Sequence, residues 1–96
     1  MSRRVFDCSS RFKKDIRKVS KTINLALLPE WIEVMSCLLN NIQMSRERED
    51  HDLTGDWNGF RECHILPDLL LIYKKNKAGM VELARLGSHS ELKITN

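Results

Sequence analysis

Apolar residues in the first third of the chain recur at helical spacing. They fall at positions i, i+4, i+7 and i+11, which share one face of an α-helix. We expect this helix over residues 10–24, with Ser9 or Ser10 capping its start. The residues of the apolar stripe are Phe12, Ile16, Val19 and Ile23.

A second helix is expected to begin near Pro29. Proline suits a first helical turn, and the neighbouring Glu30 complements the positive end of the helix dipole. Asn40 and Asn41 mark the end of this helix. A short strand is expected before the first helix, from Arg3 to Cys8. The stripe of the second helix comprises Trp31, Met35, Leu38 and Ile42, widened by Ile32 and Leu39.

After residue 50 the pattern becomes extended. Residues 57–65 alternate imperfectly, and a turn at 66–68 leads into 69–73, which are apolar on both faces and indicate a central strand covered on both sides. A polar loop at 74–79 then precedes a returning strand at 80–86. The order of elements predicts an α+β fold in which two N-terminal helices pack on one face of a small antiparallel β-sheet.

Length and composition point to a small intracellular protein. The 96 residues suffice for a single domain, 1–96, and 42% hydrophobic with 30% charged residues is typical of a soluble globular chain. No apolar run approaches the ~18 residues of a membrane span, and the N-terminus lacks the apolar stretch of a secretory signal. We therefore expect a cytoplasmic location without membrane contact. Three cysteines without a C-x-x-C pair are interpreted as small buried apolar residues: Cys8, Cys37 and Cys63.

Charge is distributed unevenly along the chain. The net charge is +3, but residues 1–29 hold eight of the 16 Lys and Arg and only two of the 13 acidic residues. A basic segment of this kind favours a polyanionic partner, although it is also compatible with a solvated helix face. The cationic residues opposite the first apolar stripe are Lys13, Lys14, Arg17, Lys18 and Lys21.

All three histidines lie in the second half of the chain. His51 follows a charged loop, and His64 precedes the turn that contains Asp68. Arg85 and His89 lie at the end of the last strand and just beyond it, where a continued extended pitch would give them one face. Because successive strand ends of a meander meet at one edge, several imidazoles, a carboxylate and a guanidinium can converge there.

These residue types suit RNA cleavage by the strand's own 2′-hydroxyl group. Imidazoles titrate near neutral pH and serve as base or acid, while arginine binds phosphate with a planar, permanently charged fork. Zinc binding fits less well, because no H-x-x-x-H or H-E-x-x-H spacing occurs and Cys63 and His64 should point to opposite faces of a strand. No cysteine-nucleophile motif is present. From the residues alone, RNA cleavage is one of several possible functions.

Other notable residues have simpler interpretations. Arg61 and Glu62 are interpreted as a surface pair, although Glu62 lies two positions from His64 and could share its face. The large aromatic residues are interpreted as packing and not as platforms for stacked bases: Phe12, Trp31, Trp57 and Tyr73.

The second half of the sequence resembles the YafQ group of the RelE/ParE toxin superfamily. The matching stretch, from Asp50 to Tyr73, reads D-H-D-L-T-G-D-W-N-G-F-R-E-C-H-I-L-P-D-L-L-L-I-Y, and A-R-L-G-S-H-S-E-L follows from Ala84 to Leu92. R-F-K-K-D-I-R-K near the N-terminus and L-L-N-N at 38–41 also fit, so the resemblance spans nearly the whole chain.

The resemblance implies a RelE-like fold and a ribosome-dependent mRNA interferase that needs no metal or other cofactor. It also implies a cognate antitoxin, with which the protein would form a hetero-oligomer, and contact with ribosome and mRNA. Three features depart from the pattern. Leu69 replaces a frequent tryptophan, and Lys93 replaces an aromatic residue and could contact phosphate instead. The stretch before His51 has Met44-Ser45-Arg46-Glu47 where a Leu-Pro pair and a tyrosine are expected. The catalytic residues implied by position are His51, His64, Asp68, Arg85 and His89, and those implied for RNA or ribosome binding are Lys13, Lys14, Arg17, Lys18 and Lys93.

Two other functional classes remain open at this point. One is a non-catalytic inhibitor on the same scaffold, like the gyrase-poisoning branch of the superfamily, against which the His/Asp/Arg set argues. The other is an RNA-binding module that uses the basic helix, with incidental histidines.

Overall fold

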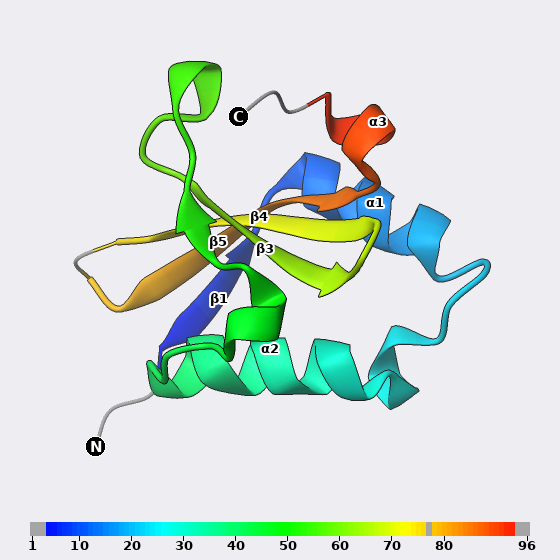
Figure 1. Ribbon diagram of the computed structural model, residues 1–96, viewed down its shortest axis with the longest axis horizontal. Helices are drawn as coiled ribbons and strands as arrows, with labels where there is room; N and C mark the ends of the chain where they lie inside the picture. The colour runs from blue at the N-terminus through cyan, green and yellow to red at the C-terminus, as the bar shows by residue number, and fades with distance from the viewer. Residues whose placement is uncertain (1–3, 77, 94–96) are drawn as a thin grey trace.

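Three antiparallel strands form the centre of the sheet: β3 (Arg61–Leu66), β4 (Leu69–Lys75) and β5 (Met80–Gly87). The computed structural model describes residues 4–76 and 78–93, and its strand order is β1-β5-β4-β3-β2 (Figure 1). β2 (His51–Asp52) pairs antiparallel with β3. β1 (Val5–Cys8) confirms the expected N-terminal strand and pairs in parallel with β5, while Arg3 lies outside the described residues.

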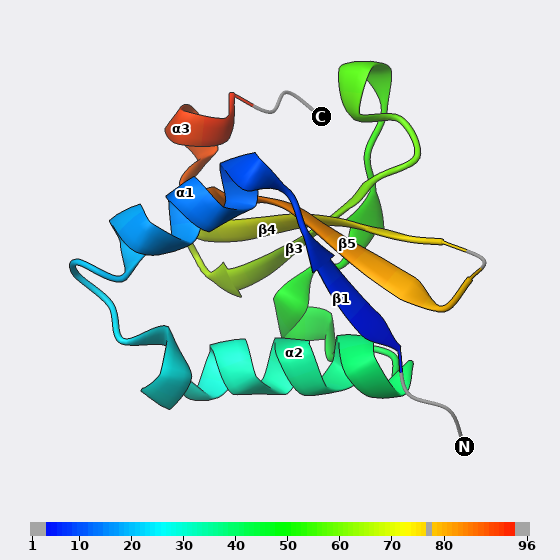
Figure 2. The same ribbon diagram turned by 180° about the vertical axis from the view of Figure 1, so that it is seen from behind.

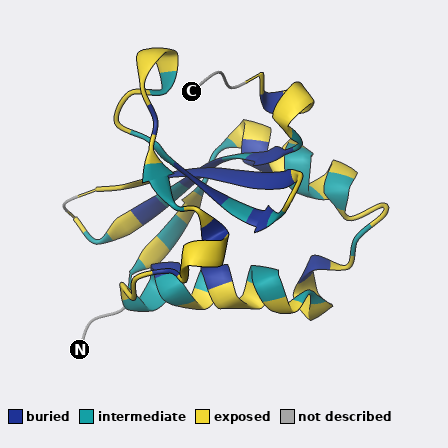
Figure 3. Ribbon diagram, in the orientation of Figure 1, coloured by how far each residue is buried: buried dark blue, intermediate teal, exposed yellow. Residues whose placement is uncertain are grey.

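β4 is buried on both sides, as its apolar run predicts. Leu69 to Tyr73 are at most 6% exposed. Leu71 and Tyr73 face a core shared with α1 and α2, whereas Leu70 and Ile72 face a smaller core on the other side of the sheet. The two cores give the sheet one face under the long helices and one that is covered more lightly. In Figure 3 most of β4 is drawn as a buried band, and its last two residues, Lys74 and Lys75, are exposed.

α1 (Ser10–Val19) begins as predicted but ends five residues early. The Ser9 hydroxyl caps it by accepting a hydrogen bond from the Phe12 backbone N–H at 3.0 Å. The prediction of helix to residue 24 was wrong, because after Val19 the chain forms a turn in which the Thr22 hydroxyl donates to the Val19 carbonyl. Ile23 still packs against the core, so the apolar spacing reflects burial beyond the helix end.

α2 (Pro29–Asn40) confirms the second predicted helix. Asn41 follows it in the left-handed conformation, with φ 53°, and turns the chain away. For this reason Ile42 leaves the predicted stripe and is 56% exposed. Ile32 lies within the helix and is 52% exposed, so its predicted place in the buried stripe was wrong. The buried stripe centres instead on Val34 and Leu38.

The segment before β3 was predicted incorrectly. Gly55–Trp57 form a 3₁₀ turn, η3, and the strand begins only at Arg61, after Gly59 with φ 93°. The imperfect alternation from residue 57 therefore reflects a packed turn, in which the ring centroids of Trp57 and Phe60 lie 5.3 Å apart. At the other end, β4 extends to Lys75, so the polar loop is shorter than expected.

A third helix, α3 (His89–Leu92), lies on the sheet face opposite α2. Ser88 and Glu91 form a capping box, in which each side chain accepts a hydrogen bond from the other residue's backbone N–H. Figures 1 and 2 show α2 along one side of the sheet and α3 on the other. The expected packing of α1 and α2 on one face is confirmed, and α3 is an addition. Among the described residues, no helix is long and apolar enough to cross a membrane.

Candidate active site

The strand register places most of the predicted site residues on one sheet face. Directly opposed residues of antiparallel strands point to the same side. Leu70 and Ile72 mark the face away from α2, and each sits in the middle of a cross-strand row. One row consists of His51, Glu62, Ile72 and Arg85, and the next consists of His64, Leu70 and Gly87.

His64 and His89 meet at the end of this face. Their ring centroids are 5.6 Å apart, and the rings cross at 74°. α3 brings His89 there as its first residue. The turn between β3 and β4 brings Asp68, whose Oδ1 accepts from the His89 backbone N–H at 3.0 Å and lies 2.7 Å from His89 Nδ1. These two hydrogen bonds hold the pKa of Asp68 below its usual value, and the bond from the backbone N–H has the larger effect.

Glu62 lies between the imidazoles of His51 and His64. Its Oε1 is 3.5 Å from Nε2 of His64 and 3.7 Å from Nε2 of His51. The opposite nitrogens face Glu49: His64 Nδ1 is 3.4 Å from its carboxylate, and His51 Nδ1 is 2.6 Å from its backbone carbonyl oxygen. The interpretation of Glu62 as part of a surface pair was wrong, since Glu62 is only 5% exposed and Arg61 pairs with Asp50 and Asp52 instead.

Arg85 shares the face of the histidines but points toward α1. Its Nε is 2.8 Å from Asp15 Oδ2 and its Nη2 is 3.3 Å from Asp15 Oδ1, and the Leu86 backbone N–H donates to the same carboxylate at 2.9 Å. The hydrogen bond to Asp15 raises the pKa of Arg85. A cleft of about 680 Å³ beside this pair is lined by Lys18 of α1, by Lys21 in the turn after α1 and by Glu91 of α3, among others.

The structure therefore brings together His51, His64, Asp68 and His89, and places Arg85 at the α1 end of the same face. Sequence reasoning missed Asp15 and Glu49. Neither lies within a histidine motif, and only the packing of α1 on β5 and the turn before β2 reveals their roles.

Exposure increases from the sheet toward α3. The side chain of Glu62 is 6% exposed, that of His64 17% and that of His89 53%. The three predicted residues His64, Asp68 and His89 thus border an open surface, which suits a polymeric substrate. Beside this surface, α1 exposes all four of its predicted binding residues, Lys13, Lys14, Arg17 and Lys18. Lys18 forms an ion pair with Glu91. The fifth predicted binding residue, Lys93, is exposed at the end of α3.

The aromatic residues pack as predicted, whereas only one of the three cysteines is buried. Phe12 and Tyr73 are buried, and Trp31 stacks on Phe12 with 6.4 Å between ring centroids, as expected for packing. Cys63 is buried on the α2 side, opposite His64, and burial raises the pKa of its thiol. Cys8 and Cys37 are only partly buried, although both pack against the core.

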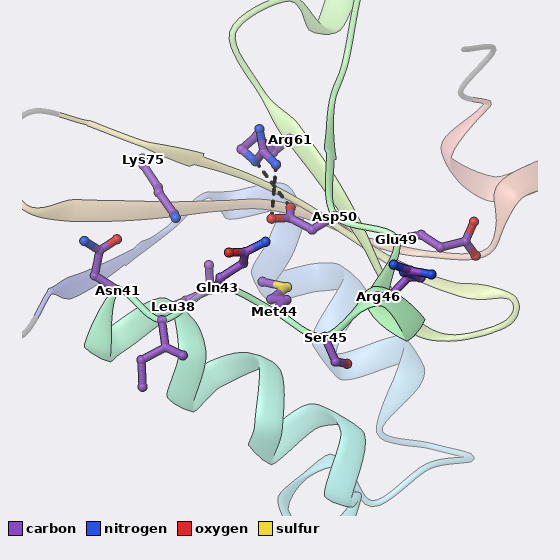
Figure 4. A pocket seen from close by; sticks show the side chains of 11 residues that line it. Leu38, Asn41, Gln43, Met44, Ser45, Arg46, Glu49, Asp50, Arg61 and Lys75 are labelled. Carbon is purple, nitrogen blue, oxygen red and sulfur yellow. Dashed lines mark hydrogen bonds and ion pairs between the residues drawn. The ribbon is translucent and has the colours of Figure 1, made fainter.

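A separate cleft of about 860 Å³ lies on the α2 side of the sheet (Figure 4). It runs between the end of α2, the segment after it and Arg61, and Lys75 and Arg46 also line it. Arg61 is tied there to Asp50, which also accepts a hydrogen bond from the buried Tyr73 hydroxyl. None of the three histidines lines this cleft.

Within residues 4–76 and 78–93, no group of three or more His, Cys, Asp or Glu side chains has a geometry that could hold a metal ion.

Comparison with known proteins gives consistent matches over nearly the whole chain. Residues 4–94 match the family model of the bacterial toxin of type II toxin–antitoxin system, YafQ. A putative toxin YafQ from Haemophilus influenzae is 33% identical over 86% of this chain and 85% of its own length. The mRNA interferase toxin YafQ from Escherichia coli is 30% identical over 96% of this chain and 98% of its own length.

Solved structures agree with these matches. The toxin in the Escherichia coli DinJ–YafQ complex is 30% identical, with a TM-score of 0.79 over 93% of this chain and 97% of that one. A metal-bound toxin from Helicobacter pylori is 36% identical, with a TM-score of 0.80 over 93% of this chain and 98% of that one.

The mixed sheet, its two covering helices and the exposed histidine face define a toxin of the RelE-like class. Within that class, the chain belongs to the YafQ family of bacterial toxins from type II toxin–antitoxin systems.

Proposed function

We propose that this protein is the toxin of a type II toxin–antitoxin pair and inhibits translation by cutting messenger RNA. The observation that carries the proposal is the contact of His64 with His89, whose Nδ1 is held by Asp68, on an exposed sheet face. Family membership supports it, since the Escherichia coli relative is named an mRNA interferase.

The proposed reaction is attack of the RNA 2′-hydroxyl on the adjacent phosphorus. A base removes the hydroxyl proton, the new P–O2′ bond forms, and the P–O5′ bond breaks as an acid protonates the leaving 5′-oxygen. The products are a 2′,3′-cyclic phosphate and a free 5′-hydroxyl. Each assisted proton transfer typically contributes ~10²–10⁴-fold to the rate.

His64 and His89 are the proposed proton carriers. Asp68 opposite Nδ1 of His89 turns the other ring nitrogen, Nε2, away from the carboxylate and toward substrate. The neighbouring His64 supplies the second imidazole 5.6 Å away, and His51 extends the set on the same face. The guanidinium of Arg85 stabilises the charge that develops on the phosphate oxygens.

These groups supply both proton transfers and the positive charge without a metal ion, so we propose that cleavage is metal-independent. We also propose that it depends on the ribosome. In this arrangement the exposed cations of α1 bind ribosomal RNA while the histidine face meets the messenger. By analogy with the DinJ–YafQ complexes, a cognate antitoxin would bind and silence the protein.

Primer extension on an actively translated transcript tests this function. The wild-type protein should produce discrete cuts in the presence of EDTA, with 2′,3′-cyclic phosphate ends, and should spare the same transcript without ribosomes. His89→Ala should reduce the cleavage rate by at least ~100-fold. Cleavage by folded His89→Ala protein at the wild-type rate would falsify the assignment of the site.

A further inference from the structure

Glu62 is a buried carboxylate within the proposed site. The residue is 5% exposed and lies on β3, in the cross-strand row of His51 and Arg85. Its Oε2 is sealed from solvent and has no hydrogen-bond partner among the described residues. Burying an ionised carboxylate without a partner is strongly unfavourable, so the groups around Glu62 must account for its retention.

The partners of this carboxylate are two imidazoles. Of the described residues, only His51 and His64 place an ionisable nitrogen beside the Glu62 carboxylate, with Nε2 3.7 Å and 3.5 Å from its Oε1. Arg85 shares the row, but the side chain of Ile72 stands between them and the Arg85 guanidinium binds Asp15. The nearby Glu49 carboxylate adds negative charge on the far side of the His64 ring.

We propose that Glu62 is a positioning residue for RNA cleavage, which fixes the ring orientation of His51 and His64. Oε1 of Glu62 attracts the Nε2 edge of both rings, while Glu49 faces the opposite edges with its carboxylate at His64 and its backbone carbonyl at His51. The other oxygen is inaccessible to an RNA hydroxyl, so Glu62 acts through the histidines and not on the substrate. This inference rests on the proposed function.

Substitution by the isosteric amide separates the charge of Glu62 from its packing. In Glu62→Gln, the side chain keeps its size, but an amide NH₂ can face the imidazoles. We expect kcat to fall roughly 10- to 100-fold, with KM within about 2-fold of the wild-type value, since the loss arises at the proton-transfer step. Glu62→Asp retains the carboxylate and should recover part of that loss.

Glu82→Gln is the matched control, because it makes the same change on β5, outside the histidine row. It should cleave like wild type. Wild-type kcat in Glu62→Gln would overturn the proposal. So would equal losses in Glu62→Gln and Glu62→Asp, because a purely structural role would not distinguish charge from amide.

Nitrogen-15 NMR of the histidine rings tests the positioning independently of activity. In Glu62→Gln, the ring-nitrogen shifts of His51 and His64 should change, while those of His89, held by Asp68, should stay the same. Unchanged spectra for His51 and His64 would overturn the proposal. Changed spectra in a protein whose wild type cuts no RNA would uphold the positioning and refute the proposed function.

Discussion

Asp68 illustrates how one side chain can both build and orient a site. The same carboxylate oxygen accepts the His89 backbone N–H, at the start of α3, and lies at hydrogen-bond distance from the His89 ring. The first contact helps to place the helix and the second selects the ring orientation. Because the pKa of Asp68 is lowered, the carboxylate stays ionised throughout the neutral range in which the reaction is proposed to run.

Replacing Asp68 by Asn should therefore impair catalysis more than folding. The amide can still accept the backbone N–H, but its neutral oxygen is a weaker acceptor for Nδ1–H of His89. We expect the cleavage rate to fall roughly 10- to 100-fold, as part of the contribution of one proton transfer is lost. Single-turnover cleavage measures the rate, and thermal unfolding of the same sample checks the fold. A wild-type rate would show that Asp68 does not orient His89.

At the scale of elements, the sequence predicted the regular parts of the fold and missed the contacts between them. The apolar run of β4 and the start of α2 at Pro29 follow from local physics, namely burial on two faces and a proline-compatible first turn. The positions of the histidines in the sequence likewise predicted that their side chains converge at one edge of the sheet. The partners Asp15 and Glu49 were not predictable, because each meets the site through tertiary packing that no local spacing encodes.

Asp15 joins α1 to β5, and its removal should destabilise the protein. Asp15→Ala leaves the Arg85 guanidinium and the Leu86 N–H without their carboxylate, in a place where Arg85 is 20% exposed. We expect a loss of about 1–3 kcal/mol in the free energy of unfolding, measured by urea denaturation. Asp7→Ala, at an exposed position of β1, is the control and should change stability by less than ~0.5 kcal/mol. Equal denaturation curves for the two variants would contradict this role of Asp15.

The cap of α3 should weaken in acid. The pKa of Glu91 is lowered to about 2, mostly by the hydrogen bond from Lys18 and next by the hydrogen bonds with Ser88. A lowered carboxyl pKa means that the contact stabilises the fold fully above the ordinary value of 4.5 and loses this effect as pH falls through about 2. The Ser88 amide resonance should therefore shift between these pH values. In Glu91→Gln, this shift should disappear, and its persistence would assign the titration to another group.

At the scale of the whole molecule, the histidine face and the basic α1 form neighbouring parts of one surface. Arg85 links them, because it lies in the row of His51 and Glu62 and ends at Asp15 on α1. The cleft of Figure 4 lies on the other side of the sheet and carries cations of its own, Arg46 and Lys75. Two basic regions can thus be compared within one protein.

This arrangement makes a specific prediction for binding to ribosomes. Reversing charge on α1 with Lys13→Glu and Lys14→Glu together should weaken binding and flatten its dependence on salt. Each lost phosphate contact removes ~0.7–0.9 from the slope of log affinity against log salt concentration, so a change of about 1.5 is expected. The double variant Arg46→Glu and Lys75→Glu changes the net charge equally in the cleft on the α2 side, and should leave the slope near the wild-type value because none of the three histidines lines that cleft. If both double variants flatten the slope alike, net charge and not the α1 surface governs binding.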